Sequence, residues 1–334
     1  MMAQSKSVAI VGATGAVGKE ILSILEERDF PVKNLRLLAS ERSAGKTLVF
    51  KDETLEVEEL TDESFAGIDI ALFSAGGAVS QEFCPVAIAE GTICVDNTSA
   101  FRMDKEVPLV VPEVNPEEIK NHKGLIANPN CSTIQMVGVL KPIHDALGLK
   151  RVIVSTYQSV SGVGTQGILE LEDQVKDISK GRPVTSKNFT SQIAFNAIPH
   201  IDSFIENGFT KEEMKMINET RKILNHPDLA ITATTVRVPV IRAHSESVNV
   251  ETEKDIDVSD LKDLLADTPG VSLIDDPSSN KYPLAVNASG KDDIFVGRIR
   301  RDESVERGFH LWIVSDNLRK GAALNAVQIA ELLV

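Results

Sequence analysis

The sequence predicts a two-domain chain, an α/β domain followed by an α+β domain, and three observations support this fold class. Short apolar runs typical of buried parallel strands alternate with helical periodicity through residues 1–130. The strands expected after Cys131 are longer and alternate in polarity, as in LKRVIVSTYQSV and HSESVNVETE, which favours a mainly antiparallel sheet. The length of 334 residues exceeds the usual size of one domain. We expect a first domain over 1–130, completed by a C-terminal helix within 316–334, and a second domain over 131–315.

The first domain is expected to form a parallel sheet covered by helices on both faces. Its expected strands are Ser7–Gly12, Leu35–Ala39, Ile68–Ser74, Thr92–Val95, Pro108–Val111 and Leu125–Asn128, and its expected helices are Val17–Arg28 and Val79–Glu90. The expected elements of the second domain are a helix that opens at Cys131, a polar, loop-rich region over 177–212, a helix from Thr210 to Leu224 and a strand over Gly308–Val314. The amphipathic final helix, Leu318–Leu332, is expected to pack back on the first domain.

Composition and charge exclude several classes of function. The net charge of -14 and the aromatic content of 4% argue against nucleic-acid binding, which needs cations and stacking side chains. No apolar run approaches the ~18 residues of a membrane span, and the N-terminus lacks the long apolar core of a signal peptide. Three cysteines indicate a reducing compartment, so we expect a cytoplasmic protein. We also expect no metal site.

A glycine motif at the start of the chain predicts a phosphate-binding turn. In SVAIVGATGAVGKEILSIL, Gly12, Gly15 and Gly18 lie between an apolar strand and an amphipathic helix, as in Rossmann-type domains. Gly12 permits the tight turn, Gly15 lets the backbone approach a pyrophosphate, and Gly18 lets the helix lie close to the strand. Backbone amides of residues 14–17, at the positive end of the helix dipole, are expected to bind the phosphates, which adds Thr14, Ala16 and Val17 to the site. The alternative is an ordinary turn between strand and helix.

The end of the second strand favours NADP over NAD. This strand runs into Ser40-Glu41-Arg42-Ser43, and an arginine beside two hydroxyls suits the 2′-phosphate of NADP. Glu41 is the residue that argues for NAD, whose ribose is usually bound by a carboxylate.

Cys131 is the candidate nucleophile. It follows the last strand of the first domain and opens a helix, whose N-terminal amides favour the thiolate and could stabilise an oxyanion. A thiolate also needs an acid or base, and His244, flanked by arginines at a strand junction, is the best candidate among six histidines. Cys84 and Cys94 are expected to be small core residues.

Five motifs in one order resemble aspartate-β-semialdehyde dehydrogenases along essentially the whole chain. They are GATGAVG at the start, NPNCST around the thiol, QSVSG at 158–162, ETRK at 219–222 and RVPV…H at 237–244. The resemblance implies a Rossmann-type NADP-binding lobe and a glyceraldehyde-3-phosphate-dehydrogenase-like catalytic and dimerisation lobe. It also implies the reversible, phosphate-dependent oxidation of aspartate-β-semialdehyde to aspartyl-β-phosphate. This reaction passes through a Cys131 acyl-thioester and serves the synthesis of lysine, diaminopimelate, threonine, methionine and isoleucine.

The same resemblance assigns roles to individual residues. His244 is implied as the acid/base that handles the thiol proton and the oxyanion, and Gln158 as the residue that positions the acyl group. Arg237 is implied to clamp the α-carboxylate, a bidentate task that lysine does poorly. The remaining implied residues are Glu219 for the ammonium group, Arg102, Lys222 and Asn130 for phosphate, and Ser161, Gly162 and Asn317 for the cofactor. Arg221 is left as a solvated or ion-paired side chain, and Arg242 has no predicted role.

Two alternatives stay open at the level of sequence. N-acetyl-γ-glutamyl-phosphate reductase runs the same chemistry on a longer substrate whose blocked amine does not need Glu219. A redox sensor that binds NADP without turnover would leave Arg237, Glu219 and Lys222 without purpose. The expected partners are the small-molecule substrate, inorganic phosphate and a second copy of the chain, in a homodimer or a homotetramer.

Overall fold

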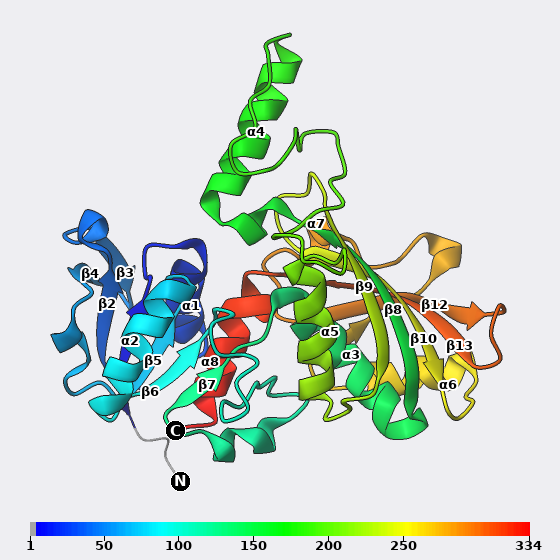
Figure 1. Cartoon of the computed structure of the whole chain (residues 1–334), viewed down its shortest axis with the longest axis horizontal. Coiled ribbons are helices and arrows are strands. Elements are labelled where there is room, and N and C mark those ends of the chain that lie inside the picture. The colour runs from blue at the N-terminus through cyan, green and yellow to red at the C-terminus, as the bar shows by residue number, and fades with distance from the viewer. Residues whose placement is uncertain (1–4) are drawn as a thin grey trace. The chain divides into compact units, whose positions relative to one another are not determined.

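The computed structural model describes residues 5–334, which fold into two units. Unit 1 contains the chain up to Asn130 together with Ala322–Val334, and unit 2 contains Cys131–Gly321. Each unit holds its own sheet, and the prediction of an α/β domain followed by an α+β domain is confirmed (Figure 1). Within residues 5–334, no helix has both the length and the hydropathy of a membrane span.

Unit 1 is a seven-stranded sheet with the order β3-β4-β2-β1-β5-β6-β7. All neighbouring strands are parallel except β3 and β4. Apolar side chains of β1, β2 and β5 form the core with one face each of α1 and α8, which pack against each other. The strands are β1 (Lys6–Val11), β2 (Val32–Ala39), β3 (Thr47–Phe50), β4 (Glu53–Glu59), β5 (Ile70–Phe73), β6 (Ile93–Asp96) and β7 (Leu125–Ala127), and the helices are α1 (Ala16–Glu27), α2 (Gly77–Ala89) and α8 (Leu324–Glu331).

Two expectations for unit 1 were wrong. The segment Pro108–Val111 is not a strand, and only Leu109 forms an isolated bridge, to Ala127, because Pro108 lacks the N–H that a ladder needs. The edge strand β3 and its neighbour β4 were missed, since ETLEVEE in β4 is mostly charged and resembles a loop. The last helix does pack on unit 1, but α8 is preceded by a π-helix over Arg319–Ala323. Cys84 and Cys94 are both buried, as predicted.

Unit 2 is a six-stranded sheet with the order β11-β12-β13-β10-β8-β9. The sheet is mixed, because β8 pairs with β9 and β11 with β12 in parallel, while the other pairs are antiparallel. Helices α3, α5 and α6 pack on this sheet. The strands are β8 (Leu149–Gln158), β9 (Ala230–Arg237), β10 (His244–Thr252), β11 (Val271–Leu273), β12 (Ile294–Asp302) and β13 (Gly308–Ser315), and the helices are α3 (Cys131–Leu147), α4 (Thr165–Ser179), α5 (Lys211–Ile223), α6 (Val258–Ala266) and α7 (Ala285–Ala288).

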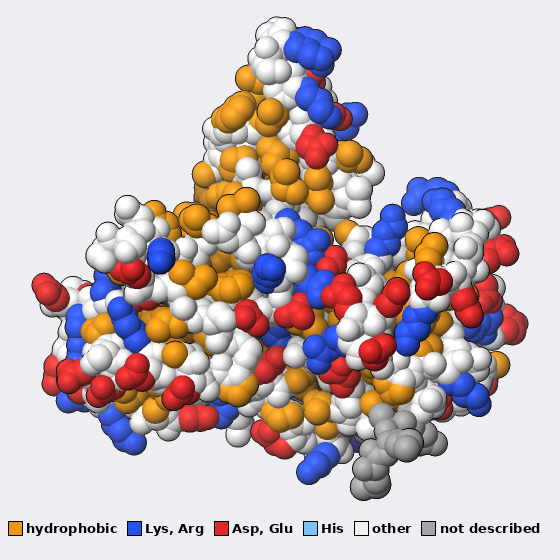
Figure 2. All heavy atoms as spheres, turned by 180° about the vertical axis from the view of Figure 1, so that it is seen from behind, with side chains coloured by type: hydrophobic (Ala, Val, Ile, Leu, Met, Phe, Trp, Pro, Cys, Tyr) orange, Lys and Arg blue, Asp and Glu red, His pale blue; other side chains and the backbone are white. Residues whose placement is uncertain are grey.

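The ends of α5 agree with the prediction, and a capping box fixes its N-terminus. The Thr210 hydroxyl accepts a hydrogen bond from the Glu213 backbone, and the Glu213 carboxylate accepts one from the Thr210 backbone. Helix α4 was not predicted. It projects from the rest of unit 2 (Figure 1), and Figure 2 shows hydrophobic side chains on the surface of this projection. Leu169 and Val175 of α4 are exposed.

Candidate active site

Unit 1 contains a cavity of about 490 Å³ at the carboxyl ends of β1 and β2. Ligands of open α/β sheets bind at this edge, and a cavity of this size suits the adenosine end of a dinucleotide. Six of the predicted cofactor residues line it: Gly12, Thr14, Gly15, Ser40, Arg42 and Ser43. Ala16 and Val17 lie in the first turn of α1, whose N-terminal amides follow Gly15.

The glycine turn leaves no room for side chains. Gly12 has φ +89°, and a Cβ atom there would lie 2.6 Å from the Ser74 carbonyl oxygen. A Cβ atom on Gly18 would lie 2.2 Å from the Gly12 oxygen. These contacts keep α1 close to β1, so its N-terminus faces the turn and could bind a pyrophosphate.

Arg42 and Glu41 both line the cavity, so the residues that argue for NADP and for NAD are side by side. Lys46 was missed by sequence reasoning, and its Nζ donates to Ser43 Oγ at 3.3 Å. A second cation therefore lies next to the hydroxyl that the sequence assigned to the 2′-phosphate.

Arg102 is anchored to the backbone of unit 1. Its Nε donates to the Asn128 carbonyl at 2.9 Å, and its Nη2 donates to the Asn97 carbonyl at 2.7 Å. Asn130, the last residue of the unit's first segment, is buried like Arg102. Lys222, the third predicted phosphate ligand, is half-buried on α5 of unit 2.

In unit 2, three predicted residues form one row across the sheet. Gln158 at the end of β8 is the register partner of Arg237 on β9, and His244 on β10 is the partner of Ser315 on β13. The β8–β10 register, which pairs Tyr157 with Ser245, places Gln158 beside His244. Register partners share a face, so these side chains meet at the end of the sheet from which α3 starts.

His244 is fully buried, and Ser159 determines its proton position. The Ser159 backbone N–H donates to His244 Nδ1 at 3.0 Å, so the proton of the neutral ring belongs on Nε2. Among residues 5–334, Nε2 has no hydrogen-bond partner. Burial first and the charge of Arg237 second hold the pKa of His244 well below 6.5. His244 is therefore a neutral imidazole with an N–H available to an oxyanion.

Arg237 is buried next to His244. Its Nη1 donates to the Ser159 carbonyl at 2.6 Å. A Cβ atom on Gly162 would lie 2.9 Å from Arg237 Nη1 and 3.6 Å from His244 Nε2, so Gly162 leaves the space beside both groups open. Arg237 also lines a cavity of about 240 Å³ that His200 and Asp202 enter from the loop before α5. The guanidinium group can thus meet a small carboxylate.

Cys131 is the first residue of α3 and is only partly buried. Burial lowers the pKa of Arg237, whereas the negative charges of Glu212 and of a Cys131 thiolate raise it. The attraction is mutual, so Arg237 and the helix N-terminus both favour the thiolate. Gly321 approaches closely, since a Cβ atom there would lie 2.9 Å from Cys131 Cβ.

Helix α5 supplies a buried carboxylate that the sequence did not single out. Glu212 Oε1 accepts a hydrogen bond from Gln158 Nε2 at 3.1 Å, and Lys215 forms an ion pair with Glu212. Glu219 lies two turns further along α5 and is buried. The only sequence signal for Glu212 was its place on the same helix face as Glu219, seven residues away.

Asn317 organises the loop that carries the other predicted cofactor residues of unit 2. Its Oδ1 accepts hydrogen bonds from Ser159 Oγ, Ser161 Oγ and the Ala243 backbone at 3.0–3.1 Å. Arg242, to which the sequence assigned no role, forms an ion pair with Asp316, the residue before Asn317.

Arg221 donates from Nε to the Leu229 carbonyl. The sequence predicted a solvated or ion-paired side chain. The structure shows in addition a hydrogen bond from this side chain to the backbone.

Known proteins are similar to this chain over nearly its whole length. Family models described as "Semialdehyde dehydrogenase, NAD binding domain" and "Semialdehyde dehydrogenase, dimerisation domain" match residues 7–122 and 140–320. An aspartate-semialdehyde dehydrogenase of Aquifex aeolicus (strain VF5) is 56% identical over 331 residues, which cover 98% of this chain and 97% of the relative.

Solved structures give the same result. Aspartate semialdehyde dehydrogenase II from Vibrio cholerae, complexed with ASA, has a TM-score of 0.97 at 51% identity and covers 99% of this chain and 98% of that chain. The Candida albicans enzyme with NADP has a TM-score of 0.77 at 26% identity, with coverage of 99% and 98%. Unit 1 therefore carries the nicotinamide-cofactor domain, and the motif resemblance is confirmed: the chain belongs to the aspartate-semialdehyde dehydrogenase family.

Proposed function

We propose that the protein oxidises aspartate-β-semialdehyde to aspartyl-β-phosphate, with NADP as hydride acceptor and inorganic phosphate as second substrate. The observation that carries this proposal is the cluster of Cys131, His244 and Arg237 in unit 2. It combines a nucleophile, an N–H donor for an oxyanion and a cation for a carboxylate.

In the proposed reaction, the Cys131 thiolate attacks the aldehyde carbon, and the new oxyanion accepts a hydrogen bond from His244 Nε2–H. NADP supplies the hydride acceptor that turns the adduct into a thioester. Phosphate then attacks the thioester carbon, His244 again donates to the oxyanion, and the C–S bond breaks to return the Cys131 thiolate. Gln158, held by Glu212, would position the acyl group throughout.

We assign the binding of the other charged groups of the substrates to charged and polar side chains. Arg237 would bind the α-carboxylate, and Glu219 the ammonium group, which the N-acetylated substrate lacks. Lys222, Arg102 and Asn130 are the residues that we propose for phosphate binding. Ser161, Gly162 and Asn317 would contact the nicotinamide end of NADP. Three free thiols fit a reducing compartment, and we propose a cytoplasmic location.

Omission of single components tests the reaction and its nucleophile. NADP reduction should require aspartate-β-semialdehyde and phosphate together, and Cys131→Ser should lower kcat by ~10⁴-fold because the nucleophile is lost. Cys94→Ala removes a buried thiol outside the cluster and should retain turnover. Phosphate-independent turnover, near-normal kcat of Cys131→Ser, or a preference for the N-acetyl-γ-glutamyl substrate would contradict the proposal.

The choice of NADP rests on Arg42, Lys46 and Ser43 in and beside the unit 1 cavity. Two cations and a hydroxyl match the charge and the acceptor oxygens of a 2′-phosphate. Glu41 would then point away from the phosphate.

Arg42→Ala should raise the KM for NADP by roughly 10- to 100-fold, the loss expected for charge-assisted hydrogen bonds, and should change the KM for NAD little. Arg36→Ala, which removes a cation of the preceding strand that pairs with Glu58, is the matched control. Equal effects of Arg42→Ala on both cofactors would show that Arg42 does not read the 2′-phosphate.

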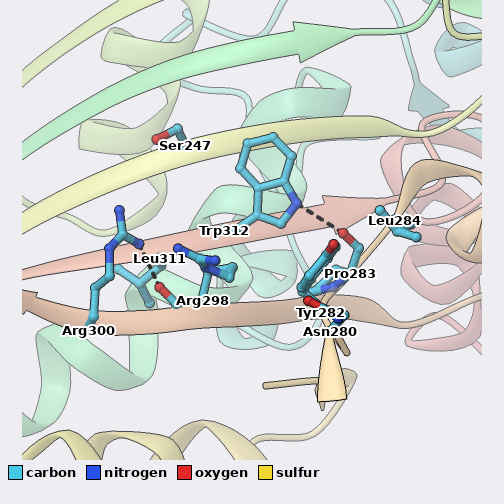
Figure 3. A pocket seen from close by; sticks show the side chains of 9 residues that line it. All are labelled: Ser247, Asn280, Tyr282, Pro283, Leu284, Arg298, Arg300, Leu311 and Trp312. Carbon is cyan, nitrogen blue, oxygen red and sulfur yellow. Dashed lines mark hydrogen bonds between the residues drawn. The ribbon is translucent and has the colours of Figure 1, made fainter. Parts of the chain in front are cut away.

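The open face of the unit 2 sheet is our proposed homodimer surface. It is the face opposite His244, and the Tyr157 and Trp312 rings lie on it 5.4 Å apart. Figure 3 shows a cavity of about 410 Å³ on this face, where Trp312 Nε1 donates to the Pro283 carbonyl. The match to a dimerisation domain over residues 140–320 supports this assignment.

Tyr157→Arg should convert a dimer of twice 36.2 kDa into a 36.2 kDa monomer in sedimentation equilibrium, because like charges would face each other across a two-fold axis. Val49→Arg on β3, also an exposed strand position, is the control and should leave the mass unchanged. A monomeric wild type, or a Tyr157→Arg protein that remains dimeric, would refute the assignment. If the wild type is a tetramer and Tyr157→Arg splits it into smaller species, the open face remains an interface and the tetramer has a second one.

A further inference from the structure

Glu246 is a buried carboxyl group that the proposed reaction does not use. It lies two residues after His244 on β10, so both side chains are on the same face of the sheet. Its side chain is fully buried, and neither carboxyl oxygen has a hydrogen-bond partner at standard geometry within residues 5–334. A buried carboxyl without a cation nearby is rare, because an unpaired buried charge costs several kcal/mol.

The residues around Glu246 form a second row behind the catalytic one. Its register partners are Thr156 on β8 and Ile313 on β13, and Thr156 pairs in turn with Thr235 on β9. Gln135 faces Glu246 from α3, one turn after Cys131. None of these four neighbours carries a charge.

The titratable groups of this sheet face lie further from Glu246. His244 lies in the next row, and Arg237 belongs to that row on β9, two strands away from β10. Glu213 of α5 accepts a hydrogen bond from the Thr235 backbone N–H on β9. Among the described neighbours of Glu246, no cation is thus placed to pair with it.

Gln135 connects Glu246 to the catalytic row. Its Nε2 donates to the His244 carbonyl at 3.5 Å, and its Oε1 has no hydrogen-bond partner within residues 5–334. A carboxylic acid and a primary amide can form a paired contact, in which the acid O–H donates to the amide oxygen and one amide N–H donates to the acid oxygen. The second amide N–H remains for the His244 carbonyl.

We propose that Glu246 is a protonated, uncharged positioning residue whose acid–amide pair with Gln135 holds the backbone of His244 against the helix that begins at Cys131. Its neutrality matters for the proposed function, on which this role rests. An ionised Glu246 would draw a proton onto His244 and would oppose a negative charge on Cys131. Burial also raises the pKa of Glu246 well above 4.5, and Gln135 opposes this shift.

The protonation state is testable without any assay of activity. Below pH 4.5, the ordinary pKa of Glu, the carboxyl is protonated in the folded and the unfolded chain and contributes no difference. Above it, the unfolded chain releases the proton while the folded protein keeps it, so the wild type loses stability relative to Glu246→Gln. The unfolding constant of the wild type divided by that of Glu246→Gln should therefore rise about tenfold per pH unit above pH 4.5, or roughly 100-fold between pH 5 and 7.

Glu251→Gln is the matched control for this measurement. Glu251 is on the same strand but forms an ion pair with Lys150. The unfolding constant of the wild type divided by that of Glu251→Gln should therefore not rise with pH. A flat ratio for Glu246→Gln, or one that falls with pH, would show that Glu246 is ionised in the folded protein and would overturn the proposal. This outcome would leave the proposed reaction intact.

Kinetics test the positioning role. Glu246→Gln removes no charge if the proposal holds, so the acidic limb of the pH profile of kcat/KM should not move. A shift of this limb to lower pH would mean that an ionised Glu246 had been raising the pKa of His244. Glu246→Met, which fits the space but cannot pair with Gln135, should lower kcat about tenfold more than Glu246→Gln does, with KM nearly unchanged. Equal kcat values would refute the acid–amide pair.

Infrared spectroscopy covers the case in which a variant fails to fold. The wild type at pH 7 should show the C=O stretching band of a protonated carboxyl group in spectra of protein labelled with ¹³C at the Glu carboxyls. Absence of any label-shifted acid band at this pH would overturn the proposal.

Discussion

The hydrogen bond from the Ser159 backbone N–H to His244 Nδ1 is the interaction on which the catalytic centre depends. Because a backbone amide can only donate, Nδ1 must accept, and the neutral ring carries its proton on Nε2. The Ser159 carbonyl accepts from Arg237, so one residue of the backbone orients both the imidazole and the guanidinium. These backbone contacts keep His244 in the donor role that an oxyanion requires, and the Ser159 hydroxyl also lies 3.0 Å from His244 Nδ1.

Strand register converts this local contact into a site. Gln158, Arg237 and His244 share one row, and Glu246 lies in the row behind it. Successive residues of a strand face opposite sides, so a slip of one residue would turn the whole row onto the open face that carries Tyr157. Helices α3 and α5 cover this face of the sheet and also supply hydrogen-bond partners to its buried polar residues. Gln135 of α3 bonds to the His244 carbonyl, and Glu212 of α5 bonds to Gln158.

Local sequence signals predicted much of this structure. The glycine turn, the helix that opens at Cys131 and the capping box of α5 depend on residues close in sequence, so the sequence sufficed for them. The charged strand β4 has no apolar alternation to reveal it, and its pairing with β2 and β3 is visible only in the sheet. Ser159, Glu212 and Glu246 could not be found, because their burial and their partners arise from strands and helices that are far apart in the chain.

The proton position on His244 is the most direct test of this account. Nitrogen NMR of protein labelled with ¹⁵N-histidine separates the two neutral tautomers and the imidazolium, and His244→Asn identifies the resonances of this ring. The account predicts a neutral ring with the proton on Nε2 at pH 7, which stays neutral as the pH falls below 6.5, since burial and Arg237 hold the pKa of His244 down. An imidazolium at pH 7, or a proton on Nδ1, would contradict it.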